Sequence, residues 1–300
     1  MKLPFCTVDV FTEQRFGGNQ LAVFVDAPEL PDELMQSIAR EFNLSETVFI
    51  VKPRDPRAAR RLRIFTTTRE LPFAGHPTIG AAQVLVEEGL VGDSGNFLLE
   101  EEVGLVPISV KRQHNGAWFV QLTTATLPQE VKPAPPATEL AKLLSIAERD
   151  ILQEADFPQI YSCGVPFLLV PLRDRSVLAR SSLDVAVSRK MRETATSPEG
   201  FVFAFTYDPQ AEDSDIRARM FANELGIAED PATGSAVAAL AGYLGQRAAK
   251  QAGTLKWTIE QGFEMGRPSL LYLEVDMDQG AVAAVRVGGT AVRVSDGVLR

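Results

Sequence analysis

The sequence predicts an α+β fold made of two pseudo-symmetric halves, each a mostly antiparallel curved sheet wrapped around a central helix. The first observation is a duplication, because Glu70–His76 and Glu229–Ser235 both read Glu-x-Pro-x-x-Gly followed by a polar residue. Each copy leads into an apolar stretch of small residues, and each follows a similar strand ending, Arg63-Ile64-Phe65 or Arg219-Met220-Phe221. The order of strand, polar turn, glycine turn and buried helix therefore occurs twice.

The second observation is that neither central helix has a polar face. The helices are expected over about residues 77–88 and 235–250, and within them residues 78–86 and 236–244 are apolar almost all round. Such a helix must be enclosed, and the short strands of each half are the abundant material to enclose it. Strands and helices do not alternate regularly, which argues against a doubly wound parallel sheet. From periodicity alone, an α+β sandwich with one helix layer stays open as an alternative.

Short runs rich in β-branched and aromatic residues, bounded by Gly, Pro, Asn or Asp, predict the strands. In the first half they cover residues 3–11, 20–26, 46–51, 60–66, 96–101, 105–112 and 117–122. In the second half they cover residues 159–162, 167–171, 201–206, 215–222, 254–261, 269–275, 281–287 and 290–294. Further helices are expected over residues 31–42, 138–144 and 184–194, with Pro31 in a first turn, and Gly89 is expected to cap the C-terminus of the first central helix.

A proline-rich segment divides the chain. Four prolines between residues 128 and 138 predict a linker. The N-terminal half is therefore expected to be residues 1–127 and the C-terminal half residues 128–300, each a barrel around its central helix. The last strand or strands are candidates to return to the N-terminal half.

Composition and charge limit the function classes. The net charge of −9 argues against nucleic acid or an anionic membrane surface as the main partner. The two cysteines, Cys6 and Cys163, form no disulfide framework. No signal-peptide pattern follows Met1, and no apolar run approaches the ~18 residues of a membrane span. We therefore expect a cytoplasmic protein that acts on a small molecule.

Three glycine turns offer backbone N–H groups to a ligand. They lie at Gly17-Gly18-Asn19, Gly75-His76 and Thr233-Gly234-Ser235. The last two stand at helix starts, where unpaired donors and the helix dipole favour an anion. One isolated turn would be more simply a tight connection, but two in equivalent places favour a shared carboxylate-binding site.

The candidate acids each have a structural alternative. Glu46 lies between a helix end and an apolar strand, and the pattern alone favours a surface residue over a buried acid/base whose pKa burial would raise. Asp230 precedes a proline and a helix start, which suits turn formation or dipole pairing, while its functional alternative is a second carboxylate of the site. Glu70 and Glu229 hold matched positions, and we interpret both as structural residues that close the turns.

The histidines and the missing motifs narrow the chemistry. His76 could hydrogen-bond a substrate oxygen or move a proton, and a capping role is equally plausible from sequence. His114 is expected in an exposed hairpin turn. Two separated histidines and two separated cysteines make no metal cluster. The sequence also lacks the glycine fingerprint of dinucleotide sites, the P-loop lysine motif and the G-x-S-x-G elbow, so no metal and no coenzyme are expected.

Five ordered motifs resemble those of the phenazine-biosynthesis PhzF-like family and span nearly the whole chain. They are Phe16-x-Gly18-Asn19-x-Leu21-Ala22-Val23-Phe24, Asn43-Leu44-Ser45-Glu46-Thr47, Arg63-Ile64-Phe65-Thr66 with Glu70 to Gly80, Glu229 to Ala236, and Gln261-Gly262 with Gly266-Arg267-Pro268. Each motif alone would be a weak signal, whereas five in this order are specific.

The resemblance implies the diaminopimelate-epimerase fold, with an active site between the two halves. The founding activity of the family is a cofactor-free isomerisation of a cyclic dihydroxy amino-acid precursor, in which a glutamate moves a proton between ring carbons. By motif matching, that glutamate corresponds to Glu46, and His76, Asp230 and Ser235 match further site positions. A homodimer is expected by the same analogy.

The chain departs from the family pattern in places that concern the pocket lining. The epimerase relatives of the family use two cysteines at the paired glycine turns, but here Ala74 and Thr233 precede the glycines, so a two-thiol mechanism is not expected. Residues other than the frequent family ones stand at Gln20, Thr67, Asn223 and Ala238-Ala239. None of these departures removes a candidate catalytic group, yet they make the phenazine intermediate itself an unsafe assignment.

The leading hypothesis is a cofactor-independent isomerase or epimerase that moves a proton on a small carboxylate-bearing substrate, for which a cyclic amino-acid-like molecule is one option. The candidate catalytic residues are Glu46, His76 and Asp230. The candidate substrate-binding residues are Gly18, Asn19, Gly75, His76, Thr233, Gly234 and Ser235. One alternative is a catalytically silent small-molecule-binding or scaffold protein that retains the fold. Another, racemisation by the two thiols, would require reactive cysteines.

Overall fold

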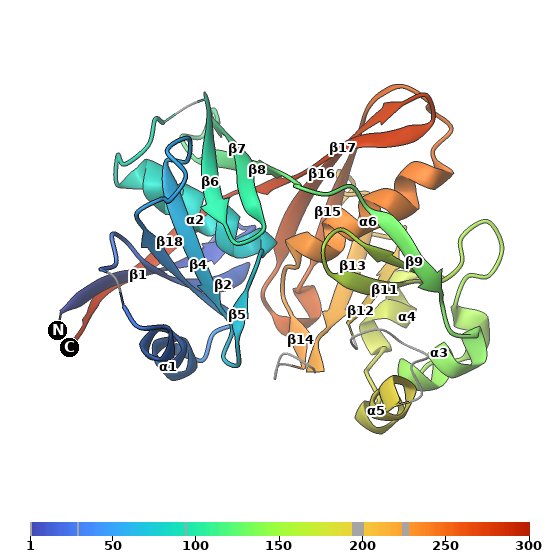
Figure 1. Ribbon diagram of the computed structural model, residues 1–300. Helices are drawn as coiled ribbons and strands as arrows, with labels where there is room; N and C mark the ends of the chain where they lie inside the picture. Colours follow the sequence, from blue (N-terminus) through green and yellow to red (C-terminus); the bar gives the residue numbers. More distant parts are fainter. Residues whose placement is uncertain (1, 29, 94, 194–200, 224–227) are drawn as a thin grey trace. The chain divides into compact units, whose positions relative to one another are not determined.

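The computed structural model describes residues 2–28, 30–93, 95–193, 201–223 and 228–300. The chain divides into two compact units (Figure 1). Unit 1 comprises Met1–Ala125, Arg267–Leu270 and Arg286–Arg300, and unit 2 comprises Thr126–Gly266 and Leu271–Val285. Both units are sheet structures with a central helix, which confirms the predicted fold class.

Unit 1 is built from strands that pair mostly antiparallel. They are β1 (Leu3–Val10), β2 (Asn19–Phe24), β3 (Glu46–Val51), β4 (Arg60–Phe65), β5 (Glu70–Leu71), β6 (Gly95–Glu101), β7 (Gly104–Arg112), β8 (Trp118–Thr123), the end of β17 (Ala281–Gly289) and β18 (Ala291–Leu299). Strand β1 pairs antiparallel with β2 and β18, so the two ends of the chain lie side by side (Figure 1). The pairs β2–β3 and β4–β6 are parallel.

Two helices accompany these strands, α1 (Asp32–Phe42) and α2 (Gly75–Glu87). Every residue of α2 from Gly75 to Val86 is buried, and the helix packs against β1, β2, β3, β4, β8 and β18. Gly80 permits this close approach, since a Cβ atom there would lie 2.6 Å from a methyl group of Leu21 and 2.8 Å from one of Val10. The apolar helix is therefore enclosed by its sheet, as the sequence predicts.

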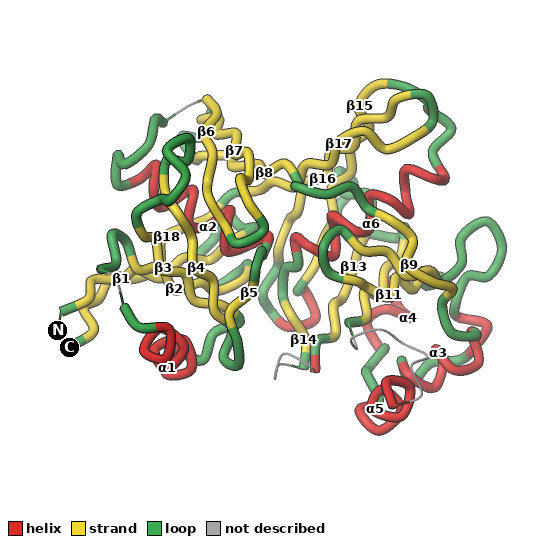
Figure 2. The backbone as a smooth tube through the Cα atoms, in the orientation of Figure 1, coloured by secondary structure: helices red, strands yellow, loops and turns green. Residues whose placement is uncertain are grey.

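Unit 2 repeats this construction. Its strands are β9 (Gln129–Pro133), β10 (Gln159–Ser162), β11 (Pro166–Pro171), β12 (Val202–Thr206), β13 (Ile216–Phe221), β14 (Glu229–Asp230), β15 (Gly253–Gln261), most of β16 (Ser269–Asp278) and the start of β17. Its helices are α3 (Ala137–Leu143), α4 (Arg175–Arg180), α5 (Val185–Glu193) and α6 (Gly234–Arg247), with 3₁₀ turns at Glu148–Asp150 and Phe263–Met265. Helix α6, which is apolar and mostly buried, packs against β9, β10 and β11. Figure 2 shows α6 near β9 and β11.

The duplication seen in the sequence is a duplication of strand pairing. In unit 1, β1–β2 is antiparallel, β2–β3 is parallel and β3–β4 is antiparallel. Strand β4 then pairs antiparallel with the two-residue strand β5 and parallel with β6. Strands β10 to β15 follow the same order around β13. The register agrees residue by residue, because Phe65 pairs with Glu70 as Phe221 pairs with Glu229. The two copies can therefore be compared at single positions.

Matched ion pairs close the two turns. Arg63 donates hydrogen bonds from Nε and Nη2 to the Glu70 carboxylate, and Arg219 donates from the same two atoms to Glu229. Each guanidinium also lies over the phenylalanine two residues further on, at 5.3 Å for Phe65 and 4.9 Å for Phe221. The structural interpretation of Glu70 and Glu229 is thus confirmed.

Some elements differ from the sequence-based expectation. The segment predicted as a linker, residues 128–138, contains strand β9, which tolerates its prolines because Pro128 precedes the strand and Pro133 ends it. Helix α4 and the two-residue strands β5 and β14 were not predicted, since they are shorter than the periodicity signal needs. Residue 194, the predicted end of a helix, lies outside the described residues. In the part of the chain described, no helix has the length and apolarity to cross a membrane.

The enclosure of both helices predicts that their interior glycines cannot carry side chains. A Cβ atom at Gly242 of α6 would lie 2.6 Å from the Tyr161 ring. We expect Gly80→Val and Gly242→Val each to lower the free energy of unfolding by about 1–3 kcal/mol through overpacking. Chemical denaturation measures the loss. Ser37→Val on the exposed face of α1 controls for a β-branched residue in a helix, and destabilisation no greater than in that control would contradict the enclosure.

Candidate active site

Glu46 is the buried acid of unit 1. Helix α1 ends at Asn43, which adopts left-handed backbone angles and donates its N–H to Ala39, and β3 then begins at Glu46. Only 7% of Glu46 is exposed, since the residue lies in the sheet beside Leu21 of β2. The interpretation of Glu46 as a surface residue is therefore wrong. Glu46 is buried because the apolar strand that it begins packs in the core.

His76 faces this acid from the first turn of α2. Its Nε2 atom lies 3.3 Å from Oε2 of Glu46, and the ring is 5% exposed. Burial lowers the pKa of His76 to about 3, an effect that the nearby backbone carbonyl of Gln20 only partly offsets. The imidazole is therefore neutral at physiological pH, and His76 and Glu46 do not form a charged pair.

Asn19 sets the proton position on this neutral ring. Its side-chain amide Nδ2 lies 3.2 Å from Nδ1 of His76. With the Asn19 amide in this orientation, Nδ2 donates and Nδ1 accepts, which assigns the ring proton to Nε2. That atom faces Glu46, which places a neutral N–H donor next to a carboxylate. Asn19 is thus hydrogen-bonded to His76, and His76 Nε2 lies 3.3 Å from Glu46 Oε2 without the geometry of a hydrogen bond.

The loop that carries Asn19 is clamped from the far end of the sequence. Arg267 donates to the backbone oxygens of Gly17 and Gly18 at 2.6 and 2.8 Å, and to Asp9 Oδ1 at 2.6 Å. The other oxygen of Asp9 accepts the N–H of Phe16 at 2.7 Å. Gly18 has a φ of 61°, and a Cβ atom there would lie 2.3 Å from the carbonyl oxygen of Val10, so only glycine fits.

The first turn of α2 also presents backbone donors. Its N-cap, Ala74, has no side-chain group that could accept a hydrogen bond from Gly75 or His76. No acidic residue stands in that turn. Helix N-termini of this kind favour an anion through their N–H groups and dipole. The predicted substrate-binding residue Gly75 therefore lies in an anion-favouring turn next to Glu46 and His76.

Unit 2 carries the second glycine turn with a different set of polar side chains. Asp230 is 6% exposed, and its Oδ2 accepts a hydrogen bond from the Thr233 hydroxyl at 2.6 Å. Gln261 accepts the Thr233 N–H at 3.0 Å and donates to the Asp230 carbonyl at 2.7 Å. The N-cap hydroxyl of Thr233 is thus turned toward Asp230 and does not cap α6. Gly234 and Ser235 open the helix, as predicted.

The predicted site residues therefore fall into two groups. In unit 1 the structure brings together Asn19, Glu46, Gly75 and His76, with Gly18 shaping the loop before Asn19. In unit 2 it brings together Asp230, Thr233, Gly234 and Ser235. His114 lies in an exposed hairpin turn, as predicted, and takes no part in either group.

The sequence analysis did not single out several residues that hold these turns. They are Asp9 and Glu101, together with Gln261 and Arg267, which were indicated only as members of a family motif. Asp9 and Arg267 are far apart in the chain, so no local pattern could pair them. Glu101 and Gln261 could have been found by extending the duplication from the glycine turns to the strands that follow the central helices.

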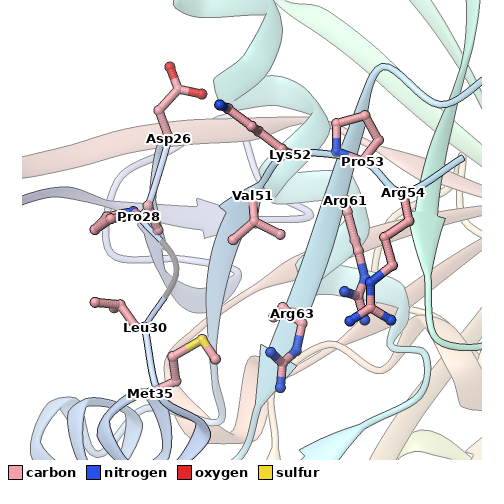
Figure 3. Close-up of a pocket in the computed structure, with 11 residues that line it drawn as sticks. Asp26, Pro28, Leu30, Met35, Val51, Lys52, Pro53, Arg54, Arg61 and Arg63 are labelled. Carbon is pink, nitrogen blue, oxygen red and sulfur yellow. The ribbon is translucent and has the colours of Figure 1, made fainter. Parts of the chain in front are cut away.

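A pocket of about 810 Å³ lies elsewhere on unit 1 (Figure 3). One end is apolar, with Leu30 and Met35, and the other holds arginines that include Arg61 and Arg63. None of the predicted site residues is among the described residues that line it. Arg63 is bound by Glu70, and Arg61 Nε lies 3.5 Å from Glu100. Its other charged groups are Lys52 and Asp26, which pairs with Arg60; Glu46 and His76 do not line it, and the substrate is not assigned to it.

The cysteines and the acidic residues do not suggest other chemistry. Burial raises the pKa of the Cys6 thiol to about 11, which disfavours the nucleophilic thiolate. Cys163 is also buried and donates to the Thr126 carbonyl. Within the described ranges, no cluster of three or more His, Cys, Asp or Glu side chains could hold a metal ion.

Comparison with known proteins gives the family. The family model described as phenazine biosynthesis-like protein matches residues 8–297. An uncharacterized isomerase of Mesorhizobium japonicum is 41% identical over 297 residues, covering 97% of this chain and 96% of that protein. The trans-2,3-dihydro-3-hydroxyanthranilate isomerase of Pseudomonas aeruginosa is 32% identical over 294 residues, covering 98% of each. A PhzF-family phenazine biosynthesis protein from Bacillus anthracis has a TM-score of 0.88 at 25% identity, covering 100% of this chain and 99% of that one.

These matches, together with a curved sheet around each central helix, define an enzyme of the isomerase class. The chain belongs to the phenazine biosynthesis-like (PhzC-PhzF) family, as its motifs indicate. The names of its relatives favour turnover over a catalytically silent binding protein.

The neutrality of His76 makes a prediction about acid stability. With a folded pKa of about 3 and an ordinary value of 6.5, only the unfolded state binds this proton between those two pH values. The free energy of unfolding should therefore fall as pH falls through that window, by on the order of 1 kcal/mol per pH unit for this one group. Chemical denaturation between pH 4 and about 7 should show a shallower slope in His76→Asn than in wild type. His114→Asn is the control, and equal slopes in wild type and His76→Asn would contradict a buried neutral ring.

Proposed function

We propose that this isomerase moves a proton on a small carboxylate-bearing substrate, with Glu46 as the acid/base. The observation that carries the proposal is the position of Glu46, buried and 3.3 Å from Nε2 of a neutral His76. A neutral imidazole places no positive charge beside Glu46, whereas an ion pair with an imidazolium would weaken that carboxylate as a base. Glu46 is therefore in a suitable state to take a proton from carbon.

The proposed reaction has two proton transfers. A Glu46 oxygen takes a proton from a carbon next to, or conjugated with, the substrate carboxyl group. The electron pair of the broken C–H bond moves into the conjugated system and gives an enolate-like charge. The protonated Glu46 then returns the proton to another carbon, or to the other face of the same carbon, so that atoms and charge balance.

The developing charge needs fixed donors, because carbon acids of this kind are weak. The backbone N–H groups at the start of α2 and the Nε2–H of His76 are the candidates in unit 1. Donors held in place before the reaction stabilise such charge without reorganising, and the loss of one donor typically costs about 3 kcal/mol of barrier. Clamping by Asn19 and Arg267 supports this preorganisation.

The relatives suggest a substrate class. One is named trans-2,3-dihydro-3-hydroxyanthranilate isomerase and is 32% identical over nearly the whole chain. A cyclic amino-acid-like carboxylate is therefore our proposal for the class. We also propose that Asp230 serves the same substrate by binding its amino or hydroxyl group, and that side chains alone carry out the transfer. A homodimer, expected by analogy, stays a prediction.

The first test is Glu46→Gln with trans-2,3-dihydro-3-hydroxyanthranilate as the starting compound. Removal of a general acid/base typically costs about 10²–10⁴ in rate. We expect a loss of this size in solvent deuterium incorporation, followed by NMR, while binding measured by calorimetry changes little. Glu41→Gln, on the exposed face of α1, is the matched control. Undiminished exchange in Glu46→Gln would remove the role assigned to this acid.

A second test addresses the turn of unit 2. Asp230→Asn keeps an oxygen that can accept from Thr233, so the turn should hold while the charge is lost. We expect kcat/KM to fall by at least about tenfold, the effect of losing a charged hydrogen bond to substrate, with the melting temperature nearly unchanged. Glu229→Gln, which weakens the ion pair with Arg219, should instead act mainly on stability. A kcat/KM equal to wild type in Asp230→Asn would confine Asp230 to a structural role.

A further inference from the structure

We infer that Glu101 is a positioning residue of the His76 turn and that it acts as a neutral carboxylic acid, whose proton the turn requires. Its connection to catalysis rests on the function proposed for His76. The protonation of Glu101 itself does not depend on that function.

The first argument is a count of hydrogens. Glu101 ends β6 with 3% of its surface exposed. The hydroxyl oxygen of Thr78 lies 2.5 Å from Glu101 Oε1 and 2.6 Å from the carbonyl oxygen of Ala74. A hydroxyl has one hydrogen, and a carbonyl can only accept it. If Thr78 donates to Ala74, the short contact with Glu101 needs a hydrogen from Glu101.

The surroundings of the second oxygen of Glu101 also favour a neutral side chain. Oε2 is buried, and no hydrogen-bond partner for it exists among the residues that the structure describes. Among the described residues, the Thr78 hydroxyl and the Ala74 amide are the donors near this carboxyl group, and a buried charge with so few donors is costly in a protein interior. A neutral acid avoids most of that cost.

The second copy of the fold supplies an independent comparison. Arg61 pairs with Glu100 in the parallel β4–β6 ladder, as Arg217 pairs with Glu260 in the β13–β15 ladder. The next residues along, Glu101 and Gln261, are therefore equivalent. Unit 2 thus has a neutral side chain, that of Gln261, at the position that Glu101 holds in unit 1.

Gln261 shows what this position must do. It accepts the N–H of the α6 N-cap, Thr233, and donates to the Asp230 carbonyl and to the Thr233 hydroxyl oxygen. In unit 1 the backbone amide of the α2 N-cap, Ala74, likewise faces the Glu101 carboxyl group. An amide both accepts and donates, whereas a glutamate can do both only when it is protonated.

The surroundings of Glu101 agree with this state. Burial raises the pKa of Glu101 to about 8, against the lowering effect of the Thr78 hydroxyl and the Ala74 amide. A shallow polar pocket of about 330 Å³ borders it, and its other charged groups are Asp32 on α1, Arg54 after β3, Arg61 and Arg63 on β4, Glu70 on β5, and Glu100 and Glu102 beside it. Arg63 is bound by Glu70 and Asp32, and Arg61 faces Glu100.

The consequence is a pH-sensitive hold on the catalytic turn. Thr78 and Ala74 belong to the turn that carries His76, two residues after the N-cap. When Glu101 loses its proton, the Thr78 hydroxyl can donate its one hydrogen either to the Ala74 carbonyl oxygen or to Glu101 Oε1, so one of these two hydrogen bonds is lost. The start of α2 is then less firmly held, and we expect activity to fall on the alkaline side.

Glu101→Gln is the direct test, since it gives unit 1 the residue that unit 2 has. Activity should stay within about threefold of wild type near neutral pH, because the neutral hydrogen bonds are kept, and its alkaline decline should disappear. The folded pKa lies above the ordinary value of 4.5, so Glu101 alone should contribute a rise of the unfolding constant of up to about tenfold per pH unit between 4.5 and about 8, against the opposite contribution of His76 below about pH 6.5. That rise should be absent in Glu101→Gln.

Two controls separate the proton from the shape of the side chain. Glu101→Leu fills space but makes no hydrogen bond, so it should lose activity at every pH. Gln261→Glu introduces the acid into the other copy and should create a new loss of stability with rising pH. Infrared difference spectra should show the carbonyl stretch of a protonated carboxylic acid in wild type near pH 6 that is missing in Glu101→Gln.

The outcomes are distinguishable from those of the proposed function. If Glu46→Gln keeps its exchange but Glu101→Gln removes the infrared band and the pH slope, Glu101 is a proton-carrying residue without a part in that reaction. If wild type and Glu101→Gln share one pH slope and one infrared spectrum, Glu101 is ionised and the inference is overturned.

Discussion

The enclosure of an apolar helix by a curved sheet is the constraint on which the rest of this structure depends. A helix start leaves backbone N–H groups without partners inside the helix. Because α2 is buried along its length, these groups are out of reach of most of the solvent, and strand residues or a ligand must satisfy them. Glu46, Asn19 and Glu101 all reach the first turn of α2 from strands or strand-bordering loops. The site is thus a product of the way the helix is buried.

The duplication shows how one frame serves two chemical roles. The register of the strand pairs makes Glu46 equivalent to Phe201 and Asp230 equivalent to Leu71. Each functional acid therefore has an apolar counterpart in the other copy. The ion pairs that close the turns, in contrast, are the same in both. The two copies therefore differ in the side chains near the helix starts and agree in the Arg–Glu pairs that hold the strands together.

Much of the fold could be predicted from local patterns. Helices such as α2 and α6 and the longer strands have a periodicity and composition that the sequence displays directly. The glycine turns mark where the two helices begin. Other features could not be predicted locally. The clamp of Arg267 on Asp9 and Gly17 joins distant parts of the chain, and strand β9 lies in a proline-rich segment because its prolines fall at its edges.

The candidate site likewise has features that the local sequence predicts and features that it does not. Residue types and a family motif indicated Glu46, His76 and Asp230, but whether Glu46 is buried depends on long-range packing, and local sequence favoured the surface. Glu101 was missed because a glutamate at the end of a strand is ordinarily a solvated residue. Only its equivalence to Gln261, which needs the strand register, reveals that the position requires a neutral side chain.

Burial also explains why the acid of the proposed mechanism can act as a base. A protonated histidine 3.3 Å from Glu46 would stabilise the carboxylate so strongly that it would remove a proton from carbon poorly. The enclosure that hides α2 from water lowers the pKa of His76 and keeps the ring neutral, while the contact of Asn19 with Nδ1 assigns its single proton to Nε2. The same enclosure acts on Glu101 in the opposite sense, since it raises the pKa of an acid and keeps that group neutral as well. Exclusion of water from one helix start thus sets the charge state of two residues around the proposed base.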